Sequence, residues 1–217
     1  MNHEQPPRTN GTPAQDPTAE PAATPHPEQH ERPPIAPPRI WVGSWSDYNN
    51  GHLHGQWLDA AREPAEIETD IQAMLAASPW AAHSGEPAEE WGVFDYDNFG
   101  DCRIEENENL SRISRVAKGI TEHGLAFAAW ADIVDEPDLL ANFDEAYLGH
   151  YDNLHAYVEQ LINDLGYDEL LDRAVPASIR PYVKIDITAT AHDLLLGGDL
   201  HALPAAEGGV WIFDARH

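Results

Sequence analysis

One block of the chain constrains it most: the 54 residues from Gly119 to Asp172 contain no Lys or Arg but include 13 carboxylates. Soluble domains usually mix both signs of charge on their surface, because like charges repel, and large fields of one sign serve steering or binding. The acids stand among apolar residues rather than in an uninterrupted acidic run, which is typical of folded structure. The block therefore predicts a folded surface that meets a strongly cationic partner.

Twelve acids of this block are the candidate partner-binding residues. They are Asp132, Asp135, Glu136, Asp138, Asp144, Glu145, Asp152, Glu159, Asp164, Asp168, Glu169 and Asp172.

Composition bounds the classes of protein that remain. With 217 residues, of which 42% are hydrophobic, the chain can bury a core, and its formal net charge is −26. Residues 39–217 hold most of that charge, with 33 acids against 10 bases. We expect such a chain to avoid nucleic acid and acidic membranes. Cys102 is the single cysteine, so no intrachain disulfide can form. Neither a transmembrane run nor a signal peptide is visible, which predicts the cytoplasm.

The chain divides by composition into a tail and three small units. Residues 1–38 are rich in Pro and poor in large apolar side chains, so we expect a disordered tail. The units expected after it are an α+β unit at 39–104, a helical unit at 105–142, and an acidic α+β unit at 143–217. The fold class predicted is therefore α+β, with short antiparallel sheets and helices.

The first unit should open with a hairpin. A β-prone segment runs from Arg39 to Trp45, Asn50-Gly51 suits a tight turn, and His52 to Leu58 supplies a return strand. Trp41 and Trp57 would then lie on facing strands, and we expect both in the core.

Helical periodicity marks the next segments. Pro64 suits the first turn of a helix with Ile67, Ile71, Met74 and Leu75 on one face, and 90–96 resembles a strand. In the middle unit, Leu110, Ile113, Val116 and Ile120 predict a helix ended by Gly124. Pro137 with Leu139, Leu140 and Phe143 suggests another helix there.

In the last unit, Asp152 is the expected N-cap of a helix that runs to Leu165, with Gly166 after it. Asp164, Asp168 and Asp172 would share one side if this helix continued, but the glycine leaves that open. The pattern at 185–191 allows either a strand or a helix, and 210–213 predicts a final strand.

An ordered series of short segments runs through the chain after the tail. The series begins with Ile40-Trp41-Val42-Gly43, Tyr48-Asn49-Asn50-Gly51, Gly55-Gln56-Trp57-Leu58, Val93-Phe94-Asp95-Tyr96 and Leu110-Ser111-Arg112-Ile113. It continues with Phe143-Asp144-Glu145-Ala146-Tyr147-Leu148-Gly149, Tyr151-Asp152-Asn153, Leu165-Gly166, Val175-Pro176, Ile179, Tyr182, Asp186 and His192-Asp193-Leu194. Taken in this order, the segments resemble the ArdA antirestriction family over about 39–217, with the Pro-rich tail and a long, Ala-rich Glu63–Glu90 segment as departures.

The resemblance implies an elongated homodimer, joined through its C-terminal part, whose carboxylates imitate DNA phosphates. It implies a type I restriction-modification enzyme as the partner, inhibition of cleavage with methylation left open, and carriage on plasmids and other mobile elements. It implies a non-enzymatic protein without cofactor, metal or catalytic residues. Physical spacing is compatible with this role, because helical acids four residues apart are spaced by about 6 Å, comparable to neighbouring phosphates.

Other interpretations of the same residues remain open. An acidic, Lys-poor surface is also typical of salt-adapted proteins, and only Lys118 and Lys184 are lysines. The segment from Asp95 to Glu106 partly matches a calcium-binding loop, although Phe99 stands where an oxygen ligand belongs. The chain has twelve histidines, but the sequence indicates no third ligand that would join a pair of them in a metal site. It also indicates no base beside Cys102 that would make this cysteine a catalytic nucleophile.

Overall fold

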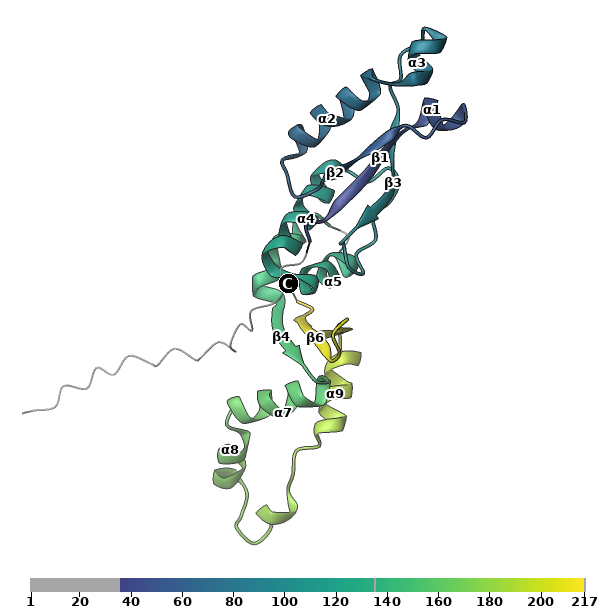
Figure 1. Cartoon of the computed structure of the whole chain (residues 1–217). Coiled ribbons are helices and arrows are strands. Elements are labelled where there is room, and N and C mark those ends of the chain that lie inside the picture. Colours follow the sequence, from purple (N-terminus) through teal and green to yellow (C-terminus); the bar gives the residue numbers. More distant parts are fainter. Residues whose placement is uncertain (1–35, 135, 217) are drawn as a thin grey trace, which may run out of the picture. The chain divides into compact units, whose positions relative to one another are not determined.

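The structure is a computed structural model that describes residues 36–134 and 136–216 (Figure 1). Two three-stranded antiparallel sheets, with helices between and beside them, make up this part of the chain. The predicted α+β class is confirmed. Asp135 and most of the predicted tail lie outside the described residues.

The first sheet has the strand order β2-β1-β3, with both pairs antiparallel. β1 spans Arg39–Ser44, β2 spans Gly55–Asp59 and β3 spans Trp91–Asp97 (Figure 1). The predicted pairing of the first two strands is confirmed, and so is the strand expected at 90–96. Residues Ile40 and Val42 of the central strand are fully buried, so one face of the sheet covers the core.

The predicted tight hairpin is wrong, because a helix fills its connection. This helix, α1 (Trp45–Asn49), begins where the Ser44 hydroxyl accepts a hydrogen bond from the Asp47 N–H at 3.3 Å. The return strand consequently starts at Gly55 rather than at His52. Only Gly51 of the expected turn has a positive φ, at 80°.

The two tryptophans do face each other, but not inside the core. Trp41 lies opposite Trp57 in the sheet register, on the face that points away from Ile40 and Val42. Trp57 is 40% exposed and Trp41 is half-buried. The prediction that both are core residues is therefore wrong, because the alternation of the strand sends the aliphatic side chains inward.

α2 (Pro64–Ala76) lies alongside the first sheet (Figure 1) and matches its prediction. Its four expected apolar residues are all buried, and each such burial contributes roughly 1.5–3 kcal/mol. The side chains of Glu63 and Glu66 form a capping box at its start. α3 (Pro79–Ser84) follows, with Ser78 as its N-cap.

α4 (Leu110–His123) also appears as predicted, buries Ile113, Val116 and Ile120, and ends at Gly124. α5 (Leu125–Ile133) follows directly, and because residues 126–131 are all buried it has no polar face. The two helices approach closely at Gly119, where an added Cβ would lie 2.3 Å from the Phe127 ring. The 3₁₀ helix η1 (Leu139–Asn142) and the short α6 (Phe143–Ala146) replace the further helix expected there.

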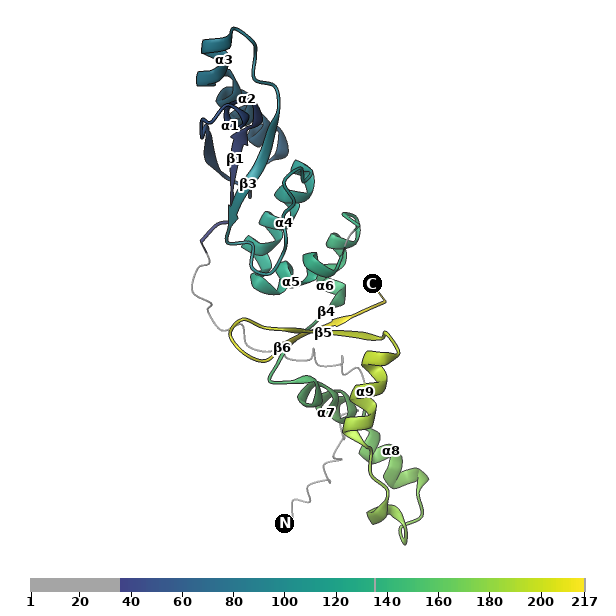
Figure 2. The same cartoon turned by 90° about the vertical axis from the view of Figure 1, so that its right-hand side faces the viewer.

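The second sheet has the order β4-β6-β5, again antiparallel. Its strands are β4 (Tyr147–Tyr151), β5 (Leu200–Pro204) and β6 (Val210–Asp214), so the predicted final strand is confirmed. The helices of this region are α7 (Leu154–Asp164), α8 (Tyr167–Ala174), η2 (Arg180–Tyr182) and α9 (Ile187–Leu196). Figure 2 shows the β5–β6 hairpin leading back from α9.

α9 settles the segment whose pattern allowed either a strand or a helix. Asp186 is its N-cap, and the carboxylate accepts a hydrogen bond from the Ala189 N–H at 2.9 Å. The buried core continues from the first sheet through α5 to β6, where the rings of Trp130 and Phe213 stack with centroids 5.4 Å apart.

Contacts with the folded part begin before β1. The Pro38 carbonyl accepts a hydrogen bond from the Ala60 N–H at 3.0 Å, and the Pro37 carbonyl accepts one from the Asn98 amide at 3.2 Å. Pro38 is also buried. The predicted boundary of the tail, at residue 38, therefore includes residues that the folded part uses.

We expect two deletions to differ in stability. Removing residues 1–35 should leave the melting temperature unchanged, because that stretch has few apolar side chains to pack. Removing residues 1–38 should cost about 1–2 kcal/mol, because Ala60 and Asn98 lose their hydrogen-bond acceptors. Urea unfolding of both proteins measures this, and equal stabilities would contradict the assignment of these contacts.

Candidate functional site: an exposed acidic surface

Eleven of the twelve candidate acids lie among the described residues, and all eleven are exposed. They come from consecutive elements between the end of α5 and the end of α8. Asp132 lies on α5, Glu136 and Asp138 precede η1, Asp144 and Glu145 lie on α6, and Asp152 precedes α7. Glu159 and Asp164 lie on α7, and Asp168, Glu169 and Asp172 lie on α8. Their exposure makes each of them accessible to a partner.

Local sequence explains how the last of these acids are placed. Asn153, not the predicted Asp152, caps α7, because its side chain accepts a hydrogen bond from the Ala156 N–H at 3.0 Å. Gly166 then adopts the left-handed conformation, with φ at 63°, which ends α7 and starts α8. Asp164 therefore lies on a different helix from Asp168 and Asp172, and the three do not share one helical face.

Arg180 of η2 neutralises two of the candidate acids. Its guanidinium donates to Asp168 Oδ1 at 3.0 Å and to Asp172 Oδ1 at 2.6 Å, and it also donates to the Val183 carbonyl at 3.1 Å. The two aspartates stand one turn apart on α8, so the planar guanidinium bridges both. Arg180 lies outside the block that lacks basic residues, so the sequence does not indicate it as a partner of these acids.

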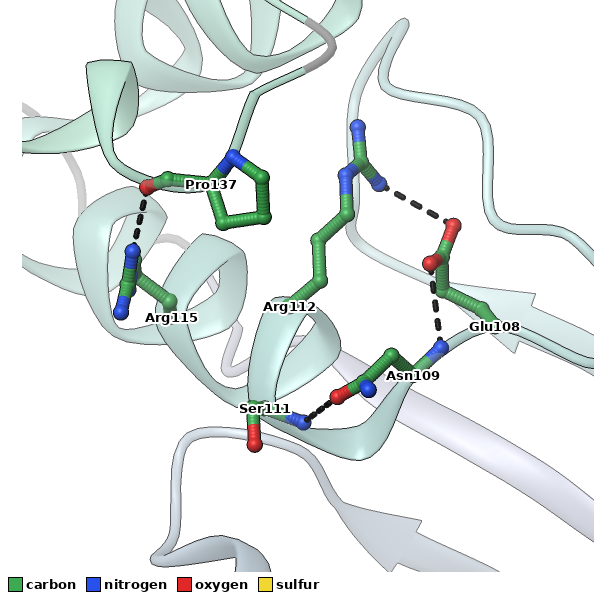
Figure 3. A pocket seen from close by; sticks show the side chains of 6 residues that line it. All are labelled: Glu108, Asn109, Ser111, Arg112, Arg115 and Pro137. Atoms are coloured by element: carbon green, nitrogen blue, oxygen red, sulfur yellow. Dashed lines mark hydrogen bonds and ion pairs between the residues drawn. The ribbon is translucent and has the colours of Figure 1, made fainter.

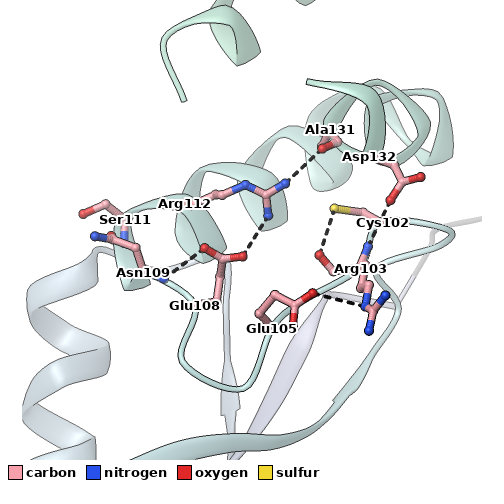
Figure 4. A network of polar contacts seen from close by, with 9 residues as sticks. All are labelled: Cys102, Arg103, Glu105, Glu108, Asn109, Ser111, Arg112, Ala131 and Asp132. Carbon is pink, nitrogen blue, oxygen red and sulfur yellow. Dashed lines mark hydrogen bonds and ion pairs between the residues drawn. The ribbon is translucent and has the colours of Figure 1, made fainter. Parts of the chain in front are cut away.

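Two more acids contact groups from outside the block, and a third lies beside a histidine within it. Asp132 accepts a hydrogen bond from the Arg103 backbone N–H at 3.4 Å (Figure 4). Asp138 lies 4.0 Å from an Arg115 nitrogen, and Asp144 lies 3.7 Å from His123 Nδ1. The block is therefore one-signed along the sequence but not in space.

Five of the candidate acids form no ion pair with any residue in 36–134 or 136–216. We call them the unpaired acids: Glu136, Asp152, Glu159, Asp164 and Glu169. Within that part of the chain, no cationic side chain lies at ion-pair distance to offset their charge. They are consequently the acids of this surface best able to exchange solvent for a cationic partner.

The cations of α4 serve contacts within the fold. Arg112 pairs with Glu108 at 3.3 Å, and both side chains are largely buried. A second Arg112 nitrogen donates to the Ala131 carbonyl at 3.0 Å, which ties α4 to α5 (Figure 4). Arg115 donates to the Pro137 carbonyl across a cavity of about 310 Å³ (Figure 3). The polar groups that line this cavity therefore already form hydrogen bonds with one another.

The alternative interpretations, a reactive cysteine and a calcium or other metal site, find little support in the described part of the chain. Cys102 is 1% exposed, and burial raises the pKa of its thiol, which disfavours the reactive thiolate. In the segment that partly matches a calcium-binding loop, Asp95 and Asp97 lie on β3, and Asp97 pairs with Arg39 at 2.8 Å. No group of three metal-ligating side chains occurs in the described part of the chain. None of its helices is long and apolar enough to span a bilayer.

Residues 40–207 match the model of a protein family described as Antirestriction protein (ArdA). The matched range covers all the candidate acids and nearly all of the first sheet, and it ends before β6, the central strand of the second sheet. A search among curated proteins finds no match to the chain.

Proposed function

Because the chain belongs to the ArdA family of antirestriction proteins, we propose that it inhibits a type I restriction-modification enzyme by imitating DNA. The observation that carries this proposal is that the eleven described candidate acids, from Asp132 on α5 to Asp172 on α8, are all exposed. In the proposed complex the protein occupies the DNA-binding groove of the enzyme and blocks cleavage of incoming DNA.

Electrostatics supplies the physical reason. Duplex DNA presents one negative charge per roughly 1.7 Å of its axis, and proteins hold it chiefly through Lys and Arg along a groove. Carboxylates on helices and loops can meet the same cations. Individual surface ion pairs contribute only about 0–1 kcal/mol, so affinity depends on the sum of many weak terms rather than on one contact.

The proposed inhibitor works without chemistry of its own. It needs no metal, nucleotide or catalytic residue, and it acts stoichiometrically because it competes for a site. We further propose that it acts as a homodimer, which doubles the length of acidic surface that one groove can meet. Methylation by the same enzyme should be blocked to the extent that it uses the same DNA-binding groove.

A competition experiment tests the proposal. A purified type I enzyme is mixed with fluorescent duplex DNA, and the inhibitor is titrated at several salt concentrations. We expect stoichiometric displacement of DNA that weakens steeply with salt, because the Debye length is already about 8 Å at physiological ionic strength. EDTA should not change the displacement itself.

Two other outcomes would favour the competing interpretations. A salt-adapted protein with another role should not displace DNA at any salt concentration. A calcium-binding module should show calcium-dependent displacement or a calcium-dependent melting temperature. Displacement that does not respond to salt would contradict charge mimicry even if the enzyme is inhibited.

A further inference from the structure

The outward face of the first sheet carries a row of aromatic and acidic side chains. In the register of the strands, Trp57 lies opposite Trp41, and Trp41 lies opposite Asp95. Residues directly opposite one another point to the same face of a sheet. Trp57 is 40% exposed, Asp95 is exposed and Trp41 is half-buried, so solvent reaches this row.

A row of glycines lets the rings lie close against the sheet. Gly43 pairs with Gly55 on one side and with Gly92 on the other. A Cβ added at Gly43 would lie 2.7 Å from the Trp41 ring and 2.9 Å from the Phe94 ring. The register shift beside Trp41 brings Phe94 to this face, where its ring centroid lies 5.6 Å from that of Trp41. The glycines therefore fix a pre-organised aromatic surface.

In the neighbouring row, an aromatic ring and a carboxylate of the same sheet already contact a guanidinium. Arg39 lies between Asp59 and Asp97 in the register. Its guanidinium carbon lies 4.6 Å from the centre of the Trp57 ring, and its nitrogens donate to Asp97 at 2.8 and 3.1 Å. One guanidinium is thus held by an aromatic face together with a carboxylate.

The row beside it has the same two components, an aromatic ring and a carboxylate, and no cation among the described residues pairs with them. Trp41 supplies the aromatic face, and the Asp95 carboxylate forms no ion pair with any described residue. The hydrogen bond that it accepts from the Tyr96 N–H at 2.8 Å is local, and the Asp95 side chain is exposed and therefore accessible. The formal net charge of −26 disfavours an anionic ligand at this position.

We propose that this face binds an arginine side chain on a basic segment of a protein partner, with the guanidinium packed on Trp41 and hydrogen-bonded to Asp95. The site lies outside the acidic block and uses different chemistry, so it goes beyond the proposed DNA mimicry. Arginine is favoured over lysine because its planar guanidinium stacks on aromatic rings and pairs with a carboxylate through two donors.

The test is a titration of the ¹⁵N-labelled full chain with a short arginine peptide, followed through the indole N–H resonances by NMR. We expect the Trp41 resonance to shift, and the same peptide with lysines to bind several-fold more weakly. Asp95→Asn should weaken arginine-peptide binding several-fold. This exposed side chain can be replaced without a cavity, and the melting temperature confirms that the variant is folded.

Asp101→Asn is the matched control, since it removes one exposed aspartate that forms no ion pair with any described residue and lies outside both the first sheet and the acidic block. It should leave the Trp41 shift and the peptide affinity unchanged. Equal binding of both peptides, or equal losses in the two variants, would overturn the proposal in favour of diffuse charge attraction. Self-association that shifts the same indole resonance without peptide would overturn it in favour of a second copy as the occupant.

Discussion

Replacing Asp47 by Ala should lower the free energy of unfolding by about 2–4 kcal/mol, the largest stability effect of any single acid in the described part of the chain. Asp47 is fully buried. Its carboxylate accepts a hydrogen bond from the Ser78 hydroxyl at 2.6 Å and one from the Trp80 N–H at 2.9 Å. These donors belong to the start of α3, so the alanine leaves them unsatisfied and also removes a favourable anion from the helix N-terminus.

The loss should depend on pH. Burial by itself raises the pKa of Asp47, but hydrogen bonds from Ser44, Ser78 and Trp80 outweigh it and hold the pKa below its ordinary value. A carboxyl with a depressed folded pKa contributes stability above its unfolded pKa, about 3.9, and loses it as pH falls through the folded value. The difference between wild type and Asp47→Ala should therefore be full at pH 7 and shrink below about pH 4.

Urea unfolding across this pH range measures the effect. Asp101→Ala is the control, because this exposed acid should change stability by no more than about 0.5 kcal/mol. A loss for Asp47→Ala that is equally small, or one that persists undiminished in acid, would show that the buried hydrogen bonds do not carry the effect.

Elements with a strong local signal could be predicted from the sequence. α2 and α4 each place apolar residues at helical spacing. Gly124 supplies the backbone conformation that ends α4, and Gly166 supplies the one that ends α7. β6 reads as a short apolar strand and forms one. α5 lacks such a signal, because its six consecutive buried residues, 126–131, show no periodic polar face.

The opening hairpin could not be predicted, because its connection depends on a residue distant in sequence. Asn50-Gly51 carries a turn signal. However, the Asp47 carboxylate accepts hydrogen bonds from Ser78 and Trp80, more than 30 residues away, and this contact favours α1 over a tight turn. The tryptophans were misplaced for a related reason. Strand alternation predicts that Trp41 and Trp57 share a face, but not that the smaller aliphatic residues fill the core.

The acidic surface was predictable as a composition and not as a geometry. The run without Lys or Arg shows where the carboxylates gather, and all the described ones are indeed exposed. It does not show that Arg115 and Arg180 reach into the block from other elements. Ion pairing across the fold therefore separates the unpaired acids from those whose charge is already offset.

Neutralising the five unpaired acids together should weaken binding to the type I enzyme by about 10-fold or more, the largest functional effect we expect. Each replacement by Asn or Gln removes one weak term, worth about 0–1 kcal/mol, from a distributed sum. Single replacements should therefore cost little, and losses should grow with the number of charges removed. The melting temperature should stay the same or rise, because the changes relieve self-repulsion and leave the core untouched.

A matched control removes the same number of charges near the first sheet. Its five acids are exposed and form no ion pair with any described residue: Glu86, Glu89, Glu90, Asp101 and Glu106. Glu63 at the N-cap of α2 and Asp70 within it are unsuitable, because Glu63 pairs with Lys118 at 2.6 Å and Asp70 pairs with Arg62 at 2.6 Å. Neutralising either acid would break an ion pair, so it would change the stability of the fold together with the charge.

We expect the control set to weaken binding less than the unpaired acids, because the acidic block is proposed to lie nearest the cationic groove. Asp168→Asn with Asp172→Asn gives a third comparison. It should cost less affinity per charge than the unpaired acids, because Arg180 already offsets both carboxylates, and it should lower stability instead.

DNA displacement and thermal unfolding of the three sets decide the matter. Equal affinity losses for all three would mean that net charge alone attracts the enzyme, and a total loss from one residue would mean a hot spot instead of a distributed phosphate-like surface.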